Sequence, residues 1–86
     1  MKIINLADFA DGGITRERVF RERVAALDVE SFRDEEVLIK GCADMPIPTW
    51  AFMMITARVA QVADMITFGE EAAPMVLYER APEPTR

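Results

Sequence analysis

The apolar positions of the chain form short β-favouring runs, separated by two longer stretches with helical spacing. The short runs predict four strands, at residues 2–9, 37–40, 65–68 and 75–78. Residues 11–13, Asp-Gly-Gly, favour a turn after the first run. The helical stretches lie between the first and second strands and between the second and third. The predicted order is therefore β-α-β-α-β-β, and the predicted fold class is α/β.

The two predicted helices differ in how much of their surface is apolar. The first, residues 16–27, has one apolar face and one charged face, and we expect Thr15 to cap its N-terminus. Glu17 and Arg21 stand four residues apart, which favours an ion pair. The second helix, from about residue 49 to 63, is apolar over most of its circumference. Because a sheet covers only one side of a helix, the remaining sides need the first helix or a second subunit.

The succession of elements also predicts the topology. Strand–helix–strand units give parallel neighbours through right-handed crossovers, so both helices are expected to cover a small mixed sheet. The connection over residues 69–74 has hairpin length, which predicts an antiparallel pair formed by the last two strands. We expect one domain over residues 1–80 and a flexible tail over residues 81–86, which holds two prolines.

Charge and size restrict the classes of partner. The 86-residue chain has a net charge of -5 and a pI near 4.6, which disfavours nucleic acid and anionic membrane surfaces. The N-terminal segment reaches Asp8 too early for a signal peptide, and the longest apolar run is too short to span a bilayer. These features lead us to expect a soluble cytoplasmic protein.

Cysteine and histidine usage limits the available chemistry. The chain has one cysteine and no histidine. An intrachain disulfide, a histidine-based triad and a histidine-ligated metal site are therefore excluded within one chain. We expect no metal and no cofactor.

The segment from residue 40 to 50 is the main candidate site. It leaves the carboxyl end of a predicted central strand and enters the second helix, a junction where α/β folds commonly bind ligands. Backbone N–H groups at the start of a helix favour an anion there. A small anionic ligand is therefore possible, and the candidate ligand-binding residues are Lys40, Cys42, Asp44, Thr49 and Trp50.

Each of these residues also has a purely structural interpretation. Cys42 is either a reactive thiolate near the positive end of the helix or a small buried apolar side chain. Asp44 could orient a donor or satisfy loop N–H groups, and Lys40 could attract an anion or remain solvated. For Thr49 we favour the interpretation as a helix cap over the interpretation as a phosphorylation site.

The excess of apolar surface on the second helix predicts association. In a small domain, apolar groups that the sheet and the first helix leave uncovered need a partner. We therefore expect a homodimer through this helix. The candidate interface residues are Trp50, Phe52, Met53 and Val59.

Residues 37–53, VLIKGCADMPIPTWAFM, resemble the DUF2480 family of bacterial proteins of unknown function. Residues 65–70, MITFGE, resemble the strand and turn that follow in that family, and residues 13–21 are similar to its helix start. Members of the family are longer and carry the strand–loop–helix element twice. The resemblance therefore implies a half-length version that pairs with itself, but it implies no activity.

Three functions remain open at this point. The first is a non-catalytic binding or interaction module that acts as a homodimer. The second is an enzyme that uses Cys42 as a thiolate nucleophile, although no histidine can serve as its base. The third is a STAS-like regulatory domain in which Thr49 is a phosphorylation switch. We favour the first, because the sequence supplies apolar surface in excess and no second catalytic group.

Overall fold

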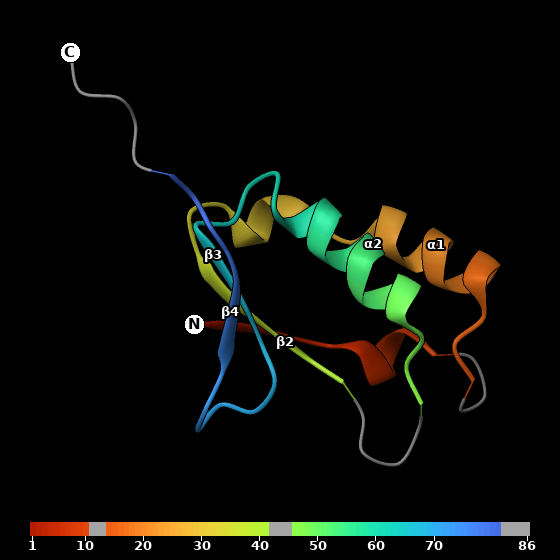
Figure 1. Cartoon of the computed structure of the whole chain (residues 1–86). Helices are drawn as coiled ribbons and strands as arrows, with labels where there is room; N and C mark the ends of the chain where they lie inside the picture. Colours follow the sequence, from red (N-terminus) through yellow and green to blue (C-terminus); the bar gives the residue numbers. More distant parts are fainter. Residues whose placement is uncertain (11–13, 42–45, 82–86) are drawn as a thin grey trace.

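The computed structural model describes residues 1–10, 14–41 and 46–81 of the chain (Figure 1). Its elements in chain order are β1 (Lys2–Asn5), α1 (Glu17–Ala26), β2 (Glu36–Lys40), α2 (Thr49–Val59), β3 (Met65–Phe68) and β4 (Met75–Glu79). Two short 3-10 turns, Leu6–Phe9 and Val29–Phe32, follow β1 and α1. The predicted order β-α-β-α-β-β and the α/β class are therefore confirmed.

The four strands form one mixed sheet in the order β1-β2-β3-β4. β2 pairs in parallel with β1 and with β3, whereas β4 pairs antiparallel with β3. The connection between β3 and β4 starts at Gly69, whose φ of 118° is a conformation that favours glycine. The predicted C-terminal hairpin is present, and β4 is an edge strand.

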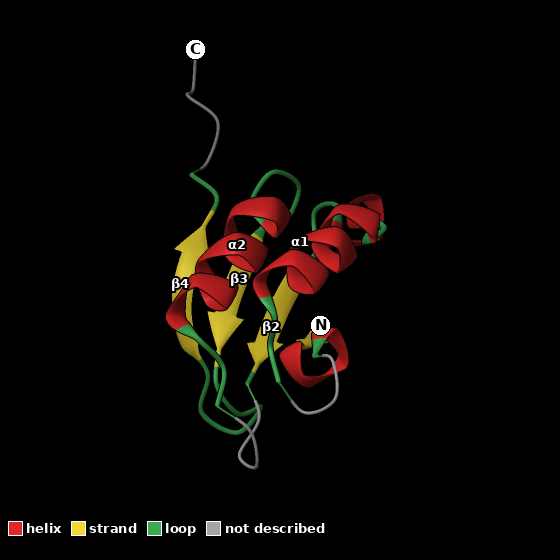
Figure 2. Ribbon diagram, turned by 90° about the vertical axis from the view of Figure 1, so that its right-hand side faces the viewer, coloured by secondary structure: helices red, strands yellow, loops and turns green. Residues whose placement is uncertain are grey.

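Both helices lie on the same face of the sheet (Figure 2). This follows from two successive parallel crossovers of the same hand, each of which returns the chain across the same side. α1 and α2 also contact one another along their sides. α2 therefore lies between α1 and the flank of the sheet that carries β4, as Figure 2 shows.

The hydrophobic core lies between this helical layer and the sheet. It includes Val37 and Ile39 of β2 and Ile66 of β3, which are fully buried. The helices contribute residues at helical spacing, and α2 buries Ala51, Ile55 and Val59 toward the sheet. Spacing of four along α2 places these three side chains in one stripe, so its other sides face α1 or the flank of β4.

The opposite face of the sheet carries a row of residues that runs across all four strands. The strand register aligns Ile3, Leu38, Thr67 and Val76 in this row. Leu38 and Thr67 lie on the central strands and are almost fully buried by their neighbours. Ile3 and Val76 lie on the edge strands and stay exposed. This face therefore presents isolated apolar residues at its two edges.

The structure corrects two predictions near the N-terminus. The first strand ends at Asn5 rather than Phe9, because the Asn5 side chain accepts a hydrogen bond from the Ala7 N–H at 3.0 Å and starts a 3-10 turn. The prediction that Thr15 caps the first helix is wrong: the N-cap is Arg16, and no side chain makes a capping hydrogen bond. The predicted Glu17–Arg21 ion pair is confirmed at 2.9 Å.

The second helix is shorter than predicted. It ends at Val59 with Ala60 as its C-cap, and residues 60–62 form a turn instead of a last helical turn. Val62 and Ala63 are nevertheless buried in the core. Their apolar character belongs to this buried turn, which is why the hydrophobic pattern extends past the end of the helix.

Candidate functional site

The sequence predicts a ligand site at the junction between β2 and α2. β2 ends at Lys40 and α2 begins at Thr49, so the expected strand–loop–helix arrangement is present. Gly41 follows the strand and lies close to the ring of Phe52, since a Cβ atom on Gly41 would come within 3.4 Å of that ring. The predicted site residues Cys42 and Asp44 lie outside the described residues.

Lys40 has acidic neighbours in the structure. Its Nζ lies 3.8 Å from a carboxylate oxygen of Glu70 and 3.6 Å from one of Glu71, in the turn between β3 and β4. The two glutamates are exposed, so these ion pairs are weak. An anion at Lys40 would nevertheless compete with these two carboxylates. The role of Lys40 in ligand binding therefore stays a prediction.

Thr49 and Trp50, the first two residues of α2, point to different sides of the helix. Trp50 packs edge-on against Phe20 of α1, with ring centroids 5.5 Å apart. Thr49 is exposed and lies beside Met53 and Leu77, on the flank that faces β4. The N-cap of α2 is Pro48, so the prediction that Thr49 caps this helix is wrong. The two residues therefore do not line one common site.

A small hollow lies beside the N-terminal ends of both helices. It has a volume of about 280 Å³ and is lined by Ile14, Thr15, Pro46, Ile47 and Pro48. The hydroxyl oxygen of Thr15 is buried there and has no hydrogen-bond partner in the described part of the chain. An unpaired buried hydroxyl is uncommon, and sequence reasoning missed it because it treated Thr15 as a cap. The expected anion site at this end of the sheet stays a prediction.

An apolar surface lies between α2 and β4, and we call it the α2–β4 groove. Its hollow has a volume of about 470 Å³ and is lined by Thr49, Phe52, Met53, Thr56, Ala57 and Leu77. A second hollow adjoins it, lined by Phe52, Phe68, Met75 and Leu77. None of these lining residues has an ionisable side chain. The groove is therefore suited to apolar contact and not to acid–base chemistry.

The form of the α2–β4 groove depends on aromatic packing and on an irregularity in the β3–β4 hairpin. Phe52 meets Phe68 edge-on, with ring centroids 5.0 Å apart, and this pair forms the floor. The β3–β4 register shifts between Ile66 and Thr67, because Tyr78 pairs with the first and Val76 with the second. Leu77 is therefore the extra residue of a β-bulge, and its side chain reaches the groove.

Sequence reasoning found one wall of this groove and missed the other. Phe52 and Met53 were predicted as interface residues, and both line it. Met75 and Leu77 were missed, although residues 75–78 carry no charge and hold apolar side chains at successive positions. Such a run at an edge strand was the available signal, because a half-buried strand normally alternates apolar and polar residues.

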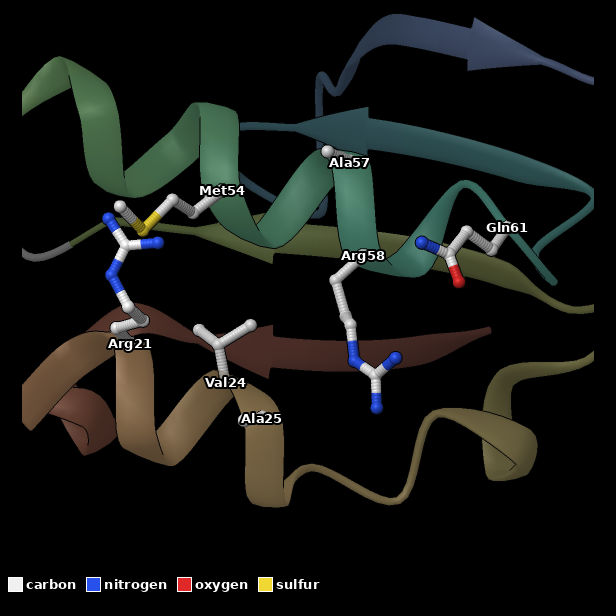
Figure 3. Close-up of a pocket in the computed structure, with 7 residues that line it drawn as sticks. All are labelled: Arg21, Val24, Ala25, Met54, Ala57, Arg58 and Gln61. Carbon is white, nitrogen blue, oxygen red and sulfur yellow. The ribbon is translucent and has the colours of Figure 1, made fainter.

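The other side of α2 forms a groove with α1, which we call the α1–α2 groove (Figure 3). It has a volume of about 460 Å³ and is lined by Arg21, Val24, Ala25, Met54, Ala57, Arg58 and Gln61. Arg21 rises from α1 toward Met54, while the side chain of Arg58 descends from α2 toward α1. The Nε of Arg58 is buried and has no hydrogen-bond partner within residues 1–10, 14–41 and 46–81. Sequence reasoning did not select Arg58 as a site residue.

Comparison with known proteins gives a family and no more. The sequence matches the model of DUF2480, described as a protein of unknown function, over residues 3–80. No curated protein and no solved structure matches the chain significantly. Within the described ranges, no helix is long and apolar enough to cross a membrane. The match covers most of the 86 residues and agrees with the resemblance of residues 37–53, so the chain belongs to the DUF2480 family of proteins of unknown function.

Proposed function

We propose that this chain is an interaction module that works as a homodimer, with two copies packed through the α2–β4 groove. One observation carries the proposal: three large apolar side chains are exposed on this one flank. Met53 is 67% exposed, Met75 56% and Leu77 44%. Contiguous apolar surface of this kind is characteristic of protein–protein contact.

The chemistry of the groove favours a second copy of the chain over a charged partner. Charged residues make up 29% of the sequence, yet none lines the groove. Depletion of charge is what distinguishes the centre of an interface from the rest of a protein surface. Because each copy has a net charge of -5, a contact free of charged groups also avoids close repulsion between two copies.

A two-fold arrangement is compatible with the shape of this surface. The groove has a hollow floored by Phe52 and Phe68, and Met53 and Leu77 project beside it. A C₂ axis brings the same patch of each copy together, so projecting side chains of one copy can fill the hollow of the other. A stable interface usually covers about 800 Å² per partner. That area is roughly one seventh of the chain's accessible surface of 5646 Å².

We revise the proposed interface according to the exposure and packing of each predicted residue. Phe52 and Met53 lie on the groove, so they stay in the proposal. Val59 is fully buried inside the chain and offers no surface to a partner. Trp50 packs against Phe20 on the α1 side of the helix. We therefore place the contact at Phe52, Met53, Met75 and Leu77.

Two adjacent positions of β4 provide a matched test. Leu77 faces the groove, whereas Val76 is aligned with Thr67 on the opposite face of the sheet. We expect the native chain to have the mass of a dimer in light scattering at high micromolar concentration. Leu77→Asp should give a folded monomer, and Val76→Asp should remain a dimer. A monomeric native chain, or equal effects of the two substitutions, would contradict the proposal.

A second candidate function is a phosphorylation switch at Thr49, and one observation favours it. The Thr49 side chain is exposed at the rim of the groove and does not cap α2. A phosphate there would add about two negative charges to an uncharged contact surface, which should separate the two copies. Thr49→Glu should therefore yield monomer, whereas Thr49→Val should remain dimeric. A dimeric Thr49→Glu variant would remove this candidate.

A further inference from the structure

We infer that the α1–α2 groove is a binding site for an amphipathic carboxylate, with the carboxylate held by Arg58 and the apolar chain laid along the two helices. This inference is independent of the proposed dimer. The α1–α2 groove lies on the side of α2 that faces α1 (Figure 3), whereas the residues of the α2–β4 groove lie on the side that faces β4. Ala57 stands on the crest between them and borders both.

The first observation that supports this inference is the lack of a hydrogen-bond acceptor and of an ion-pair partner for Arg58 among the described residues. Its side chain is half-buried between the helices, and its Nε is out of contact with solvent and has no hydrogen-bond acceptor among the described residues. Arg58 also makes no ion pair with any residue in the described part of the chain. Arg33 and Arg80, in contrast, form ion pairs with Glu30 and Asp34. A buried N–H donor left without an acceptor is unfavourable, and a bound carboxylate would supply one.

The second support is the balance of charge in the groove. Two of its lining residues are cations, Arg21 and Arg58, and none is acidic. Arg21 is already paired with Glu17 on its own helix, at 2.9 Å. One uncompensated positive charge therefore remains, which matches a ligand with one negative charge. A carboxylate fits this requirement, and its two oxygens can bind the guanidinium side by side.

The third support is the apolar wall beside Arg58. Val24 and Ala25 of α1 line the groove together with Met54 and Ala57 of α2, and Figure 3 shows Gln61 at the same end as Arg58. The volume of about 460 Å³ is within the range of about 300–1,000 Å³ typical of small-molecule sites. Met54 is flexible and polarisable, so this wall can adapt to an alkyl chain. The Gln61 amide can donate a second hydrogen bond to the carboxylate.

The probe that tests this site is octanoate, which joins one carboxylate to one short alkyl chain. We expect millimolar octanoate to shift the backbone amide NMR signals of Ala25, Ala57 and Gln61 in a saturable way. Acetate supplies the charge without the chain, and octan-1-ol supplies the chain without the charge. Both should bind about tenfold or more weakly than octanoate. Octan-1-ol that binds as tightly as octanoate would overturn the assignment of Arg58 as the anion receptor.

Three variants separate the site from general effects of charge. Arg58→Gln should weaken octanoate binding about tenfold or more, the effect expected for losing a charge-assisted hydrogen bond. Arg33→Gln removes the same charge at a position that does not line the groove, and it should leave the affinity unchanged. Ala25→Leu should fill the groove and also weaken binding, which keeps the test valid if Arg58→Gln fails to fold. Absence of octanoate binding to the native chain, or equal affinities for the native chain and Ala25→Leu, would overturn the inference.

Discussion

The guanidinium of Arg80 donates a hydrogen bond to the carboxylate of Asp34 at 2.7 Å, across 46 residues of sequence. The same guanidinium donates to the backbone carbonyl oxygens of Val62, at 2.5 Å, and Ala63, at 3.2 Å. Arg80 thereby joins the end of β4 to the turn after α2 and to the loop that precedes β2. The hydrogen bond with Asp34 raises the pKa of the Arg80 guanidinium above its ordinary value.

Loss of this contact should weaken the attachment of the edge strand. Arg80→Ala removes hydrogen bonds to two separate segments, the turn after α2 and the loop before β2, so we expect a lower melting temperature in thermal unfolding followed by circular dichroism. Asp34→Asn should have a smaller effect, because the two carbonyl contacts remain. Arg33→Ala is the control, since it breaks a local ion pair with Glu30 within one 3-10 turn. An equal decrease in melting temperature for Arg80→Ala and Arg33→Ala would contradict the role of Arg80 in attaching the edge strand.

The Glu30–Arg33 pair gives a pH-dependent prediction. The hydrogen bond from Arg33 lowers the pKa of the Glu30 carboxyl below its ordinary value of 4.5. A group whose pKa is lower in the folded state stabilises the fold above its unfolded pKa, and this contribution is lost as the pH falls through the folded pKa. An NMR titration of the Glu30 carboxyl should show the lowered pKa in the native chain and an ordinary one in Arg33→Gln. Identical titration curves would count against the pair.

The unpaired hydroxyl of Thr15 predicts an unusual response to substitution. Its oxygen is buried and finds no hydrogen-bond partner among the residues that the structure describes, and valine has nearly the same shape without the hydroxyl. Thr15→Val should therefore leave the free energy of unfolding unchanged or raise it by up to about 1 kcal/mol, as measured with urea. Thr15→Ser, which keeps the hydroxyl and loses a methyl group, is the control and should not stabilise. A clear loss of stability in Thr15→Val would mean that the hydroxyl has a partner in solution.

Most of the fold could be predicted because local periodicity records which sides of an element are buried. The run Val37–Leu38–Ile39 is apolar at consecutive positions, and all three residues are buried in the central strand β2. The spacing of Phe20 and Val24 marked the face of α1 that packs inward. The shared hand of the two crossovers then placed both helices on the sheet.

The two surfaces of our proposals could not be predicted in the same way. The α2–β4 groove depends on the contact between Phe52 and Phe68 and on the bulge that exposes Leu77, and neither is encoded in local spacing. The unpaired Nε of Arg58 follows from the way α1 and α2 pack together. Arg58 looks like an ordinary polar residue in the sequence, because an unpaired donor is defined by the groups around it.

Two neighbouring positions of α2 separate the stability of the chain from the stability of the dimer. Ile55 is fully buried, so Ile55→Ala should lower the free energy of unfolding by about 2–5 kcal/mol. Met53 is 67% exposed, so Met53→Ala removes little from the core of one chain. When only folded chains bind one another, the melting temperature increases as the protein concentration increases. We therefore expect this concentration dependence in the native chain and a much smaller one in Met53→Ala, measured by scanning calorimetry from low to high micromolar concentration. Ile55→Ala should lower the melting temperature at every concentration. A native melting temperature that does not change with concentration would contradict association through this flank of α2.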